Sequence, residues 1–270
     1  MISYPAKING TLTRLMEAGE GDNFVIFTHG VGARGDRWRR NLDPLAAAGF
    51  HCISLDLPGH GFAQKGPDFP YGVPAFADLV LGLMDMKGAK KAHLVGTSLG
   101  GHISAMVGVK APDRVKSLTL VGSTGLFPIG QEACNRIAER IVDRNLAGIE
   151  GKLKTVMLDP VHATPDFIAE EYAINNSPGS TESFQKLAVY FKEQIDKDAV
   201  GEKLAALGDR FPQLLIWGSD DKSVPVAIGE KAAALLKHAP LKIIQQTSHC
   251  PYYEKPDEFN AMVIDFLKGR

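Results

Sequence analysis

Short apolar runs rich in β-branched residues alternate along the chain with longer stretches in which apolar residues recur every three or four positions. The first four runs end at or beside Gly, Asp or His, and a helical pattern follows each of them. This alternation predicts strands joined by crossover helices in a mostly parallel sheet. The expected strands are residues 24–28, 51–55, 92–96, 118–122, 213–217 and 242–246.

The segment before the first of these runs has another pattern. Residues 6–15 alternate loosely between apolar and polar positions, and residues 17–23 are polar with two glycines. A period of two is typical of a strand with one buried face. We therefore expect an antiparallel hairpin that leads into the sheet as its edge.

Residues 126–208 interrupt the alternation of strands and helices. Helical patterns occur at residues 136–146, 167–175 and 181–195, Pro160, Pro165 and Pro178 separate them, and no strand pattern is evident. After residue 208 the strand and helix patterns resume. We expect residues 1–125 and 209–270 to form one α/β core, and residues 126–208 to form a helical cap, or lid, inserted into it.

The composition excludes several classes of protein. The 270 residues carry 30 Lys+Arg against 31 Asp+Glu, a formal charge of -1, so no bulk positive field attracts a nucleic acid. No apolar run approaches the roughly 20 residues of a membrane span, and the first residues lack a signal-peptide core. Cys52, Cys134 and Cys250 have no metal-ligand spacing and are expected to be reduced thiols. We therefore expect a cytoplasmic protein.

A candidate nucleophile lies in the sequence GTSLGG at residues 96–101, between an expected strand and an expected helix. A serine on so sharp a strand-to-helix turn needs small neighbours two residues away on either side, because the strained backbone leaves no room for Cβ atoms. Gly96 and Gly100 meet this requirement. A G-x-S-x-G match alone is weak evidence, and the flanking strand and helix strengthen the case for Ser98.

This serine turn and several further blocks resemble the α/β-hydrolase family, and together they extend over nearly the whole chain. HGVG at residues 29–32 is similar to the family's oxyanion loop, and DLPGHG at 56–61 to its D-x-P-G-x-G turn. WGSDDKSVP at 217–225 resembles its acid turn, and residues 248–249 resemble its histidine loop. The order serine, acid, histidine is that of this fold. The resemblance implies an eight-stranded, mostly parallel sheet with helices on both faces and a helical cap.

The resemblance also implies a catalytic triad of Ser98, Asp221 and His249. A serine hydroxyl is a poor nucleophile near neutral pH unless a base takes its proton, and an imidazole can do so when a carboxylate fixes its tautomer. The family pattern G-x-x-D, begun at Gly218, selects Asp221. Asp220 is the alternative acid, and its simpler expected role is to cap the helix that follows.

Acyl transfer also needs N–H donors directed at the oxyanion. The backbone N–H groups of Val31 and Leu99 are the natural pair, because each lies at a strand-to-helix turn where such groups are unpaired. Just beyond the oxyanion loop, Arg34 and Arg37 are candidates to bind a substrate carboxylate, while residues 37–40 are more simply expected to begin a solvated helix. The turn at 56–61 is expected to be architectural.

A serine nucleophile in this fold favours acyl transfer. We therefore expect hydrolysis of a small, largely apolar carboxylic ester or lactone, with no metal or organic cofactor implied. One alternative is hydrolysis of a carbon–carbon bond in a diketone or ring-cleavage product; serine members of the family that do this usually have asparagine before the serine and tryptophan after the histidine, where this chain has Thr97 and Cys250. A second alternative is a non-catalytic small-molecule receptor. The natural substrate and the oligomeric state stay open.

Overall fold

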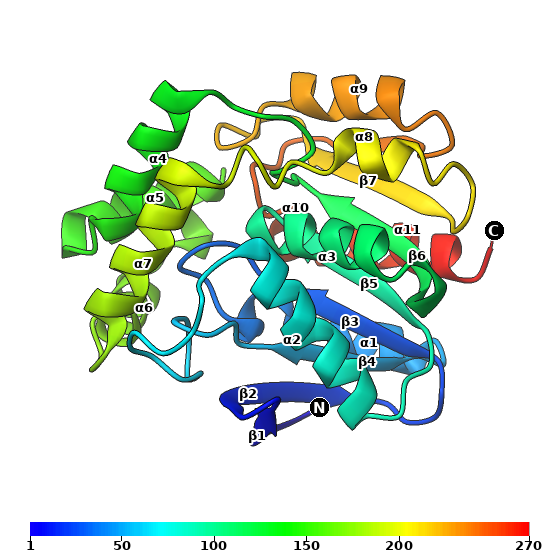
Figure 1. Cartoon of the computed structure of the whole chain (residues 1–270), viewed down its shortest axis with the longest axis horizontal. Coiled ribbons are helices and arrows are strands. Elements are labelled where there is room, and N and C mark those ends of the chain that lie inside the picture. Colours follow the sequence, from blue (N-terminus) through cyan, green and yellow to red (C-terminus); the bar gives the residue numbers. More distant parts are fainter. Residues whose placement is uncertain (270) are drawn as a thin grey trace.

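A computed structural model describes residues 1–269, and its core is one eight-stranded sheet (Figure 1). The strand order is β1-β2-β4-β3-β5-β6-β7-β8. The first two strands pair antiparallel with their neighbours, and all other pairings are parallel. The expectation of an α/β protein with a mostly parallel, eight-stranded sheet is therefore confirmed.

Each of the six strands expected after the hairpin is present, with its ends displaced by at most three residues. The hairpin turns at Asn9 and Gly10, whose φ values of 49° and 85° are both positive, as a tight two-residue turn between twisted strands requires. The strands are β1 (Ile2–Ile8), β2 (Thr11–Ala18), β3 (Phe24–Thr28), β4 (His51–Leu55), β5 (Ala92–Thr97), β6 (Val115–Val121), β7 (Gln213–Gly218) and β8 (Leu241–Ile244).

Helices cover both faces of the sheet. In β3, Phe24 and Ile26 belong to one apolar cluster and Val25 and Phe27 to another, because successive side chains of a strand point to opposite faces. The first cluster is covered by α2 (Val73–Met86), α3 (Leu99–Lys110), α8 (Gly201–Ala205) and α9 (Val226–Leu235). The second is covered by α1 (Leu42–Ala47), α10 (Pro251–Glu254) and α11 (Pro256–Leu267), together with the 3-10 turn η1 (Gly35–Trp38).

Residues 126–208, all of them described, contain helices and no strand. Four helices, which we call the cap, gather beyond one end of the sheet, at the left of Figure 1. They are α4 (Gln131–Val142), α5 (Leu146–Val156), α6 (Pro165–Asn175) and α7 (Ser180–Glu193). The next helix, α8, contacts α3 and α9 of the core instead.

Helix α5 was not among the helices expected from the sequence, and the helix expected to run to residue 146 ends at Val142. Gly148 and Gly151 weaken the helical pattern of α5. The helix nevertheless forms, because the Asn145 side chain accepts a hydrogen bond from the Gly148 N–H and caps its first turn. The remaining short 3-10 turns are η2 (Pro112–Arg114) and η3 (Pro160–His162).

Parallel strands place their carboxyl ends at one edge of the sheet, where ligand sites of open α/β sheets form. The loops that follow β3, β4, β5, β7 and β8 carry the blocks singled out in the sequence. The fold therefore brings these blocks to one edge. Within residues 1–269 no helix combines the length and the apolar character needed to cross a bilayer. The three cysteines are buried and unbridged.

Candidate active site

Ser98 occupies the turn between β5 and α3 with φ 55° and ψ -122°, a conformation that costs a non-glycine residue free energy. The two glycines of the motif make this turn sterically possible. A Cβ at Gly96 would lie 2.2 Å from the Gly100 carbonyl oxygen, and a Cβ at Gly100 would lie 2.2 Å from the Thr28 carbonyl oxygen. The strained, closely packed turn expected from the sequence is therefore present.

The glycine requirement leads to a stability prediction. We expect Gly96→Ala to lower the free energy of unfolding by at least about 3 kcal/mol, because backbone atoms must move to admit the methyl group. Gly151→Ala is the matched control: no heavy atom lies within 4 Å of the added Cβ, and alanine favours the helix by about 0.5–1 kcal/mol. Urea unfolding of the two variants measures the difference. Equal stability would show that the turn tolerates a side chain.

Asp221 and His249 come from the loops after β7 and β8 and meet in a buried pair. His249 Nδ1–H donates to Asp221 Oδ2 at 2.7 Å. The other carboxylate oxygen, Oδ1, accepts the backbone N–H groups of Ser223 and Val224 at 2.8 and 2.9 Å. With Nδ1 donating, the lone pair of the neutral imidazole lies on Nε2, so this nitrogen can accept a proton.

The neighbouring acid, Asp220, has a different environment. Its side chain is exposed and accepts a hydrogen bond from Ser219 Oγ at 2.6 Å. Among the described residues no side chain caps α9, whose N-cap is Pro225. The expectation that Asp220 caps this helix is therefore wrong, because the chain reaches Pro225 several residues later and the carboxylate stays at the start of the turn.

The loop after β6 lies between the serine turn and the acid–histidine pair. A Cβ at Gly122 would lie 3.0 Å from both Asp221 Oδ2 and His249 Nδ1. On its other side, the carbonyl of Val121 accepts the Ser98 N–H at 3.1 Å. Within residues 1–269 no hydrogen bond joins Ser98 Oγ to His249, and such bonds often tighten only when substrate binds. The structure thus brings all three residues to one place, with the His–Asp bond formed.

The loop after β3 packs against the serine turn. A Cβ at Gly30 would lie 3.0 Å from the Ser98 Cβ, so the backbone of this loop passes beside Ser98. Val31 follows directly, and Leu99 is the first residue of α3. Of the two N–H groups expected to stabilise an oxyanion, one therefore belongs to the residue after Ser98 and the other to the loop that packs against Ser98.

His29 supports this loop as a neutral side chain. Its Nδ1–H donates to the Gly30 carbonyl at 2.8 Å, and its Nε2 accepts the Leu57 N–H at 3.0 Å. Burial lowers the pKa of His29 to about 3, so the imidazole is uncharged at neutral pH. The two hydrogen bonds fix the tautomer and tie the oxyanion loop to the turn after β4. His29 therefore has a structural role in this loop.

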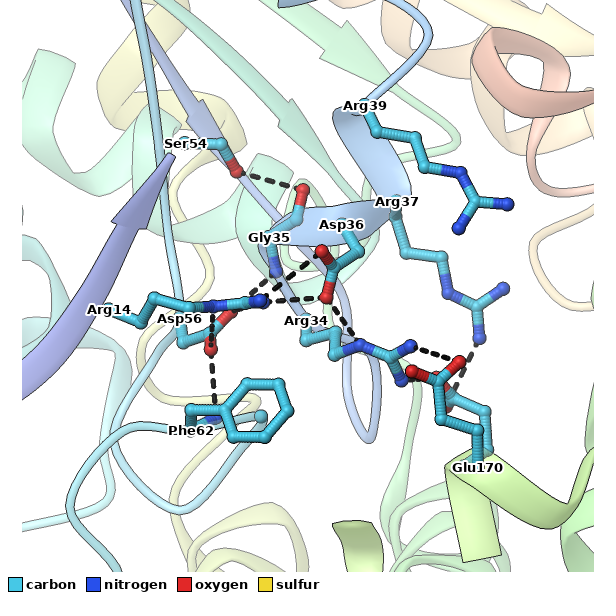
Figure 2. Close-up of polar contacts among 12 residues, drawn as sticks. Arg14, Arg34, Gly35, Asp36, Arg37, Arg39, Ser54, Asp56, Phe62 and Glu170 are labelled. Carbon is cyan, nitrogen blue, oxygen red and sulfur yellow. Dashed lines mark hydrogen bonds and ion pairs between the residues drawn. The ribbon is translucent and has the colours of Figure 1, made fainter. Parts of the chain in front are cut away.

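Asp56 organises the turn at residues 56–61, as Figure 2 shows. Its Oδ1 accepts the Gly35 N–H at 2.7 Å, and its Oδ2 accepts the Phe62 N–H at 2.8 Å and the Arg14 Nε–H at 3.0 Å. A Cβ at Gly61 would lie 2.4 Å from Asp56 Oδ2, which explains the glycine in the motif. The contacts agree with the expected architectural role.

Arg34 joins the loop to the cap. In Figure 2 its guanidinium lies between Asp36 and Glu170. Its Nε bonds Asp36 at 2.5 Å and its Nη2 bonds Glu170 at 2.8 Å, while Nη1 pairs with Glu171 of α6. The guanidinium of Arg37 pairs with the other oxygen of Glu171 at 3.2 Å. In this structure the two arginines bind cap carboxylates.

The expectation that residues 37–40 begin a solvated helix is wrong. Arg37 and Trp38 are buried in η1. The Arg37 guanidinium lies 4.5 Å from the centre of the Phe167 ring of the cap, and Trp38 stacks on Tyr252 with the ring centres 4.0 Å apart. This segment therefore connects the cap with the core. The pattern of arginines in the sequence did not indicate these contacts.

The two neighbouring glutamates provide a matched pair of variants. Glu171 has a side chain only 3% exposed and faces two buried guanidiniums, whereas Glu170 is 51% exposed. We expect Glu171→Gln to lower the free energy of unfolding by about 2–4 kcal/mol, because among the described residues it leaves the buried guanidinium of Arg37 without a carboxylate partner. Glu170→Gln is expected to cost less than about 1 kcal/mol. Urea unfolding compares them, and equal losses would mean that the buried pair stabilises no more than a surface one.

Lys152 of α5 also approaches the site and was not singled out in the sequence. Its Nζ donates to the Val31 carbonyl oxygen at 2.7 Å. The helix that carries it was not expected, and a contact over 121 positions of sequence leaves no local pattern. Glu171 lay within an expected helix, but only the fold brings it beside Arg34 and Arg37.

Comparisons with known proteins agree with this fold. Residues 23–145 match the family model for the alpha/beta hydrolase fold. A dihydrolipoyllysine-residue acetyltransferase component of the acetoin cleaving system of Cupriavidus necator is 31% identical over 267 residues, which are 98% of this chain and 68% of that protein. The 2-hydroxy-6-oxo-6-phenylhexa-2,4-dienoate hydrolase of Comamonas testosteroni is 29% identical over 263 residues, 94% of this chain and 90% of that protein.

Solved structures show the same fold. The meta-cleavage product hydrolase from Pseudomonas fluorescens IP01, in complex with acetates, matches with a TM-score of 0.87 and 24% identity, over 98% of this chain and 97% of that one. The chain belongs to the α/β-hydrolase fold family. Within that family it is a hydrolase, as the sequence predicted.

Proposed function

We propose that this chain hydrolyses a carbon–carbon bond in a diketone-type ring-cleavage product, through an acyl-enzyme on Ser98. The observation that carries the proposal is the 2.7 Å bond between His249 and Asp221 beside the strained serine turn. A bonded acid–histidine pair beside a serine turn supports the proposed roles of Ser98 as nucleophile, His249 as base and Asp221 as the acid that orients the base. The substrate is a small molecule, and no metal or organic cofactor takes part in the proposed steps.

In the first half of the reaction, His249 Nε2 takes the proton of Ser98 Oγ while the oxygen attacks a carbonyl carbon. The resulting oxyanion accepts the N–H groups of Val31 and Leu99. The adjacent carbon–carbon bond then breaks, and its electron pair moves to a carbon that a second, conjugated carbonyl stabilises as an enolate. His249 returns its proton to this product. A substrate without the second carbonyl lacks a stable leaving group.

In the second half, water replaces the released product. His249 takes a proton from the water, whose oxygen attacks the acyl carbon, and the same N–H groups stabilise the second oxyanion. The ester bond to Ser98 breaks, and the proton passes from His249 to Ser98 Oγ. A carboxylic acid leaves and the enzyme is restored.

The relatives favour carbon–carbon cleavage over the ester or lactone hydrolysis that the sequence alone placed first. The Comamonas relative, a dienoate hydrolase by name, aligns over 90% of its length. Thr97 and Cys250, the two positions at which this chain departs from such enzymes, are both buried. The Tyr252 hydroxyl donates to Cys250 Sγ at 3.6 Å. Burial raises the pKa of the Cys250 thiol to about 11, so it is not a competing nucleophile. Since the reported relatives are enzymes, a non-catalytic receptor is the weakest of the three readings.

Two substrates tested in parallel distinguish carbon–carbon cleavage from ester hydrolysis. Purified chain is incubated with 2-hydroxy-6-oxo-6-phenylhexa-2,4-dienoate and with p-nitrophenyl butyrate, each against Ser98→Ala. We expect loss of the dienoate absorbance with one equivalent of benzoate, absent in the variant, and kcat/KM at least about 100-fold above that for the ester, a difference of about 2.7 kcal/mol in transition-state binding. Faster ester turnover with an inert dienoate would return ester hydrolysis to first place.

A further inference from the structure

Lys152 extends from the cap to the loop after β3, where a glycine leaves room for its ammonium group. Its Nζ donates to the Val31 carbonyl at 2.7 Å. The next residue, Gly32, has φ +62°, and a Cβ there would lie 2.3 Å from the Lys152 Nζ. A side chain at residue 32 would therefore displace the ammonium. The contact depends on both a lysine in the cap and a glycine in the loop.

The cap holds this loop at a second point as well. Asn175, at the end of α6, donates from Nδ2 to the Gly32 carbonyl at 3.3 Å. Two successive carbonyls of the oxyanion loop thus accept hydrogen bonds from the cap. The orientation of the peptides next to the Val31 N–H is therefore set by helices that are far away in the sequence.

The ammonium has no carboxylate within ion-pair distance among residues 1–269. The charged and titratable groups around it are Glu171 on α6, Arg37 on η1, the Cys250 thiol, and His29 and His60 in the loops after β3 and β4. Both oxygens of the glutamate are already engaged by guanidiniums. A half-buried cation without a carboxylate at ion-pair distance is costly, and ionisable groups perturbed in this way are concentrated at functional sites.

We propose that Lys152 is a positioning residue for the reaction at Ser98: it fixes the Val31 peptide so that the loop's N–H faces the oxyanion, and its positive charge favours that oxyanion. The inference rests on the proposed function and deepens it. It makes a complete oxyanion site dependent on a closed cap, because opening the cap withdraws the ammonium from the loop.

The charge of Lys152 can be titrated separately from its neighbours. Burial lowers the pKa of Lys152 to about 8. The nearby Glu171 carboxylate raises this pKa, and the Arg37 guanidinium lowers it further. The ammonium is therefore present below pH 8 and is lost as the pH rises through 8. The Cys250 thiol has a pKa raised to about 11, and His29 and His60 have pKa values lowered to about 3 by burial. None of these three changes charge near pH 8.

The test measures the rate at which a fluorophosphonate labels Ser98 between pH 7 and 9.5. The reagent's phosphoryl oxygen occupies the oxyanion site as the serine–phosphorus bond forms and fluoride leaves. For the parent we expect the maximal rate to fall about tenfold across pH 8, as one nearby charge is lost. For Lys152→Met we expect a maximal rate about 10- to 100-fold lower at pH 7, with unchanged reagent affinity and no step at pH 8.

Lys154→Met is the matched control. Lys154 lies on the same helix, is exposed and pairs only with Glu150 of its own helix, so its variant is expected to keep the parental rate and pH step. A parental rate that stays constant through pH 8 would overturn the inference, even if Lys152→Met fails to fold. So would a folded Lys152→Met that keeps the step. Absence of label on Ser98 in the parent at every pH would instead refute the proposed function.

Discussion

Replacing Ser98 with alanine is expected to reduce turnover of the dienoate by about 10⁴-fold or more. The variant removes the atom that attacks the carbonyl carbon, and no neighbouring group can take its place. Of the two residues next to His249, Ser248 donates its hydroxyl to the Thr155 carbonyl at 2.8 Å, and Cys250 is buried with a raised pKa. Alanine keeps the Cβ and the backbone of the turn, so the fold is expected to remain intact.

The measurement is a progress curve of dienoate absorbance with parent and variant at equal concentrations of folded protein. Ser177→Ala serves as control, because Ser177 lies between two cap helices, where its hydroxyl donates to the Ile174 carbonyl at 2.8 Å and lies 3.4 Å from the Ser180 hydroxyl. Thermal unfolding confirms that each protein is folded. If Ser98→Ala retained activity within about tenfold of the parent, the acyl-enzyme mechanism would be wrong.

Asp221→Asn is expected to lower kcat by about 10⁴-fold. An amide presents an N–H in place of one carboxylate oxygen, so it stabilises the imidazole tautomer with the proton on Nε2, which cannot accept the serine proton. It also removes the negative charge that stabilises the imidazolium. The two backbone N–H groups that bind Oδ1 keep the side chain in place, so the loss belongs to the chemistry.

The neighbouring acid is the control for this second variant. Asp220→Asn changes the same formal charge one residue away, but its carboxylate is exposed and accepts only from Ser219 among the described side chains. Its kcat is expected to stay within about twofold of the parent, as is usual for a surface change. Equal losses for both variants would show that the charge of the loop, and not the bond to His249, supports the reaction.

The fold followed from the sequence because its signals are local. Buried strands such as β3 and β4 are short apolar runs bounded by turn residues, and both begin and end where the pattern placed them. The serine turn was partly readable in the same way: the clash at Gly96 is with the Gly100 carbonyl of the same turn, whereas Gly100 is constrained by the Thr28 carbonyl, which only the fold brings there. The resemblance to the family's G-x-x-D pattern, begun at Gly218, selected Asp221, and the structure bonds that residue to His249.

The cap was harder to read because its contacts are distant in sequence. Two glycines obscured α5, and with it Lys152. The sequence shows Arg34 and Arg37 as a basic segment beside the loop. Both arginines pair with the carboxylate of Glu171, which lies 137 positions after Arg34. Neither ion pair leaves a periodic or spaced signal. Side chains that connect cap and core therefore had to come from the structure.

The most direct test of Ser98 as the nucleophile needs no natural substrate. The parent chain is treated with a fluorophosphonate, digested and mapped by mass spectrometry, alongside Ser98→Ala and Asp221→Asn. We expect one phosphonyl group per chain, on the peptide that contains Ser98, none in Ser98→Ala and a much slower reaction in Asp221→Asn. A folded parent that stays unlabelled, or carries the label on another residue, would contradict the assignment of Ser98, Asp221 and His249 as one catalytic unit.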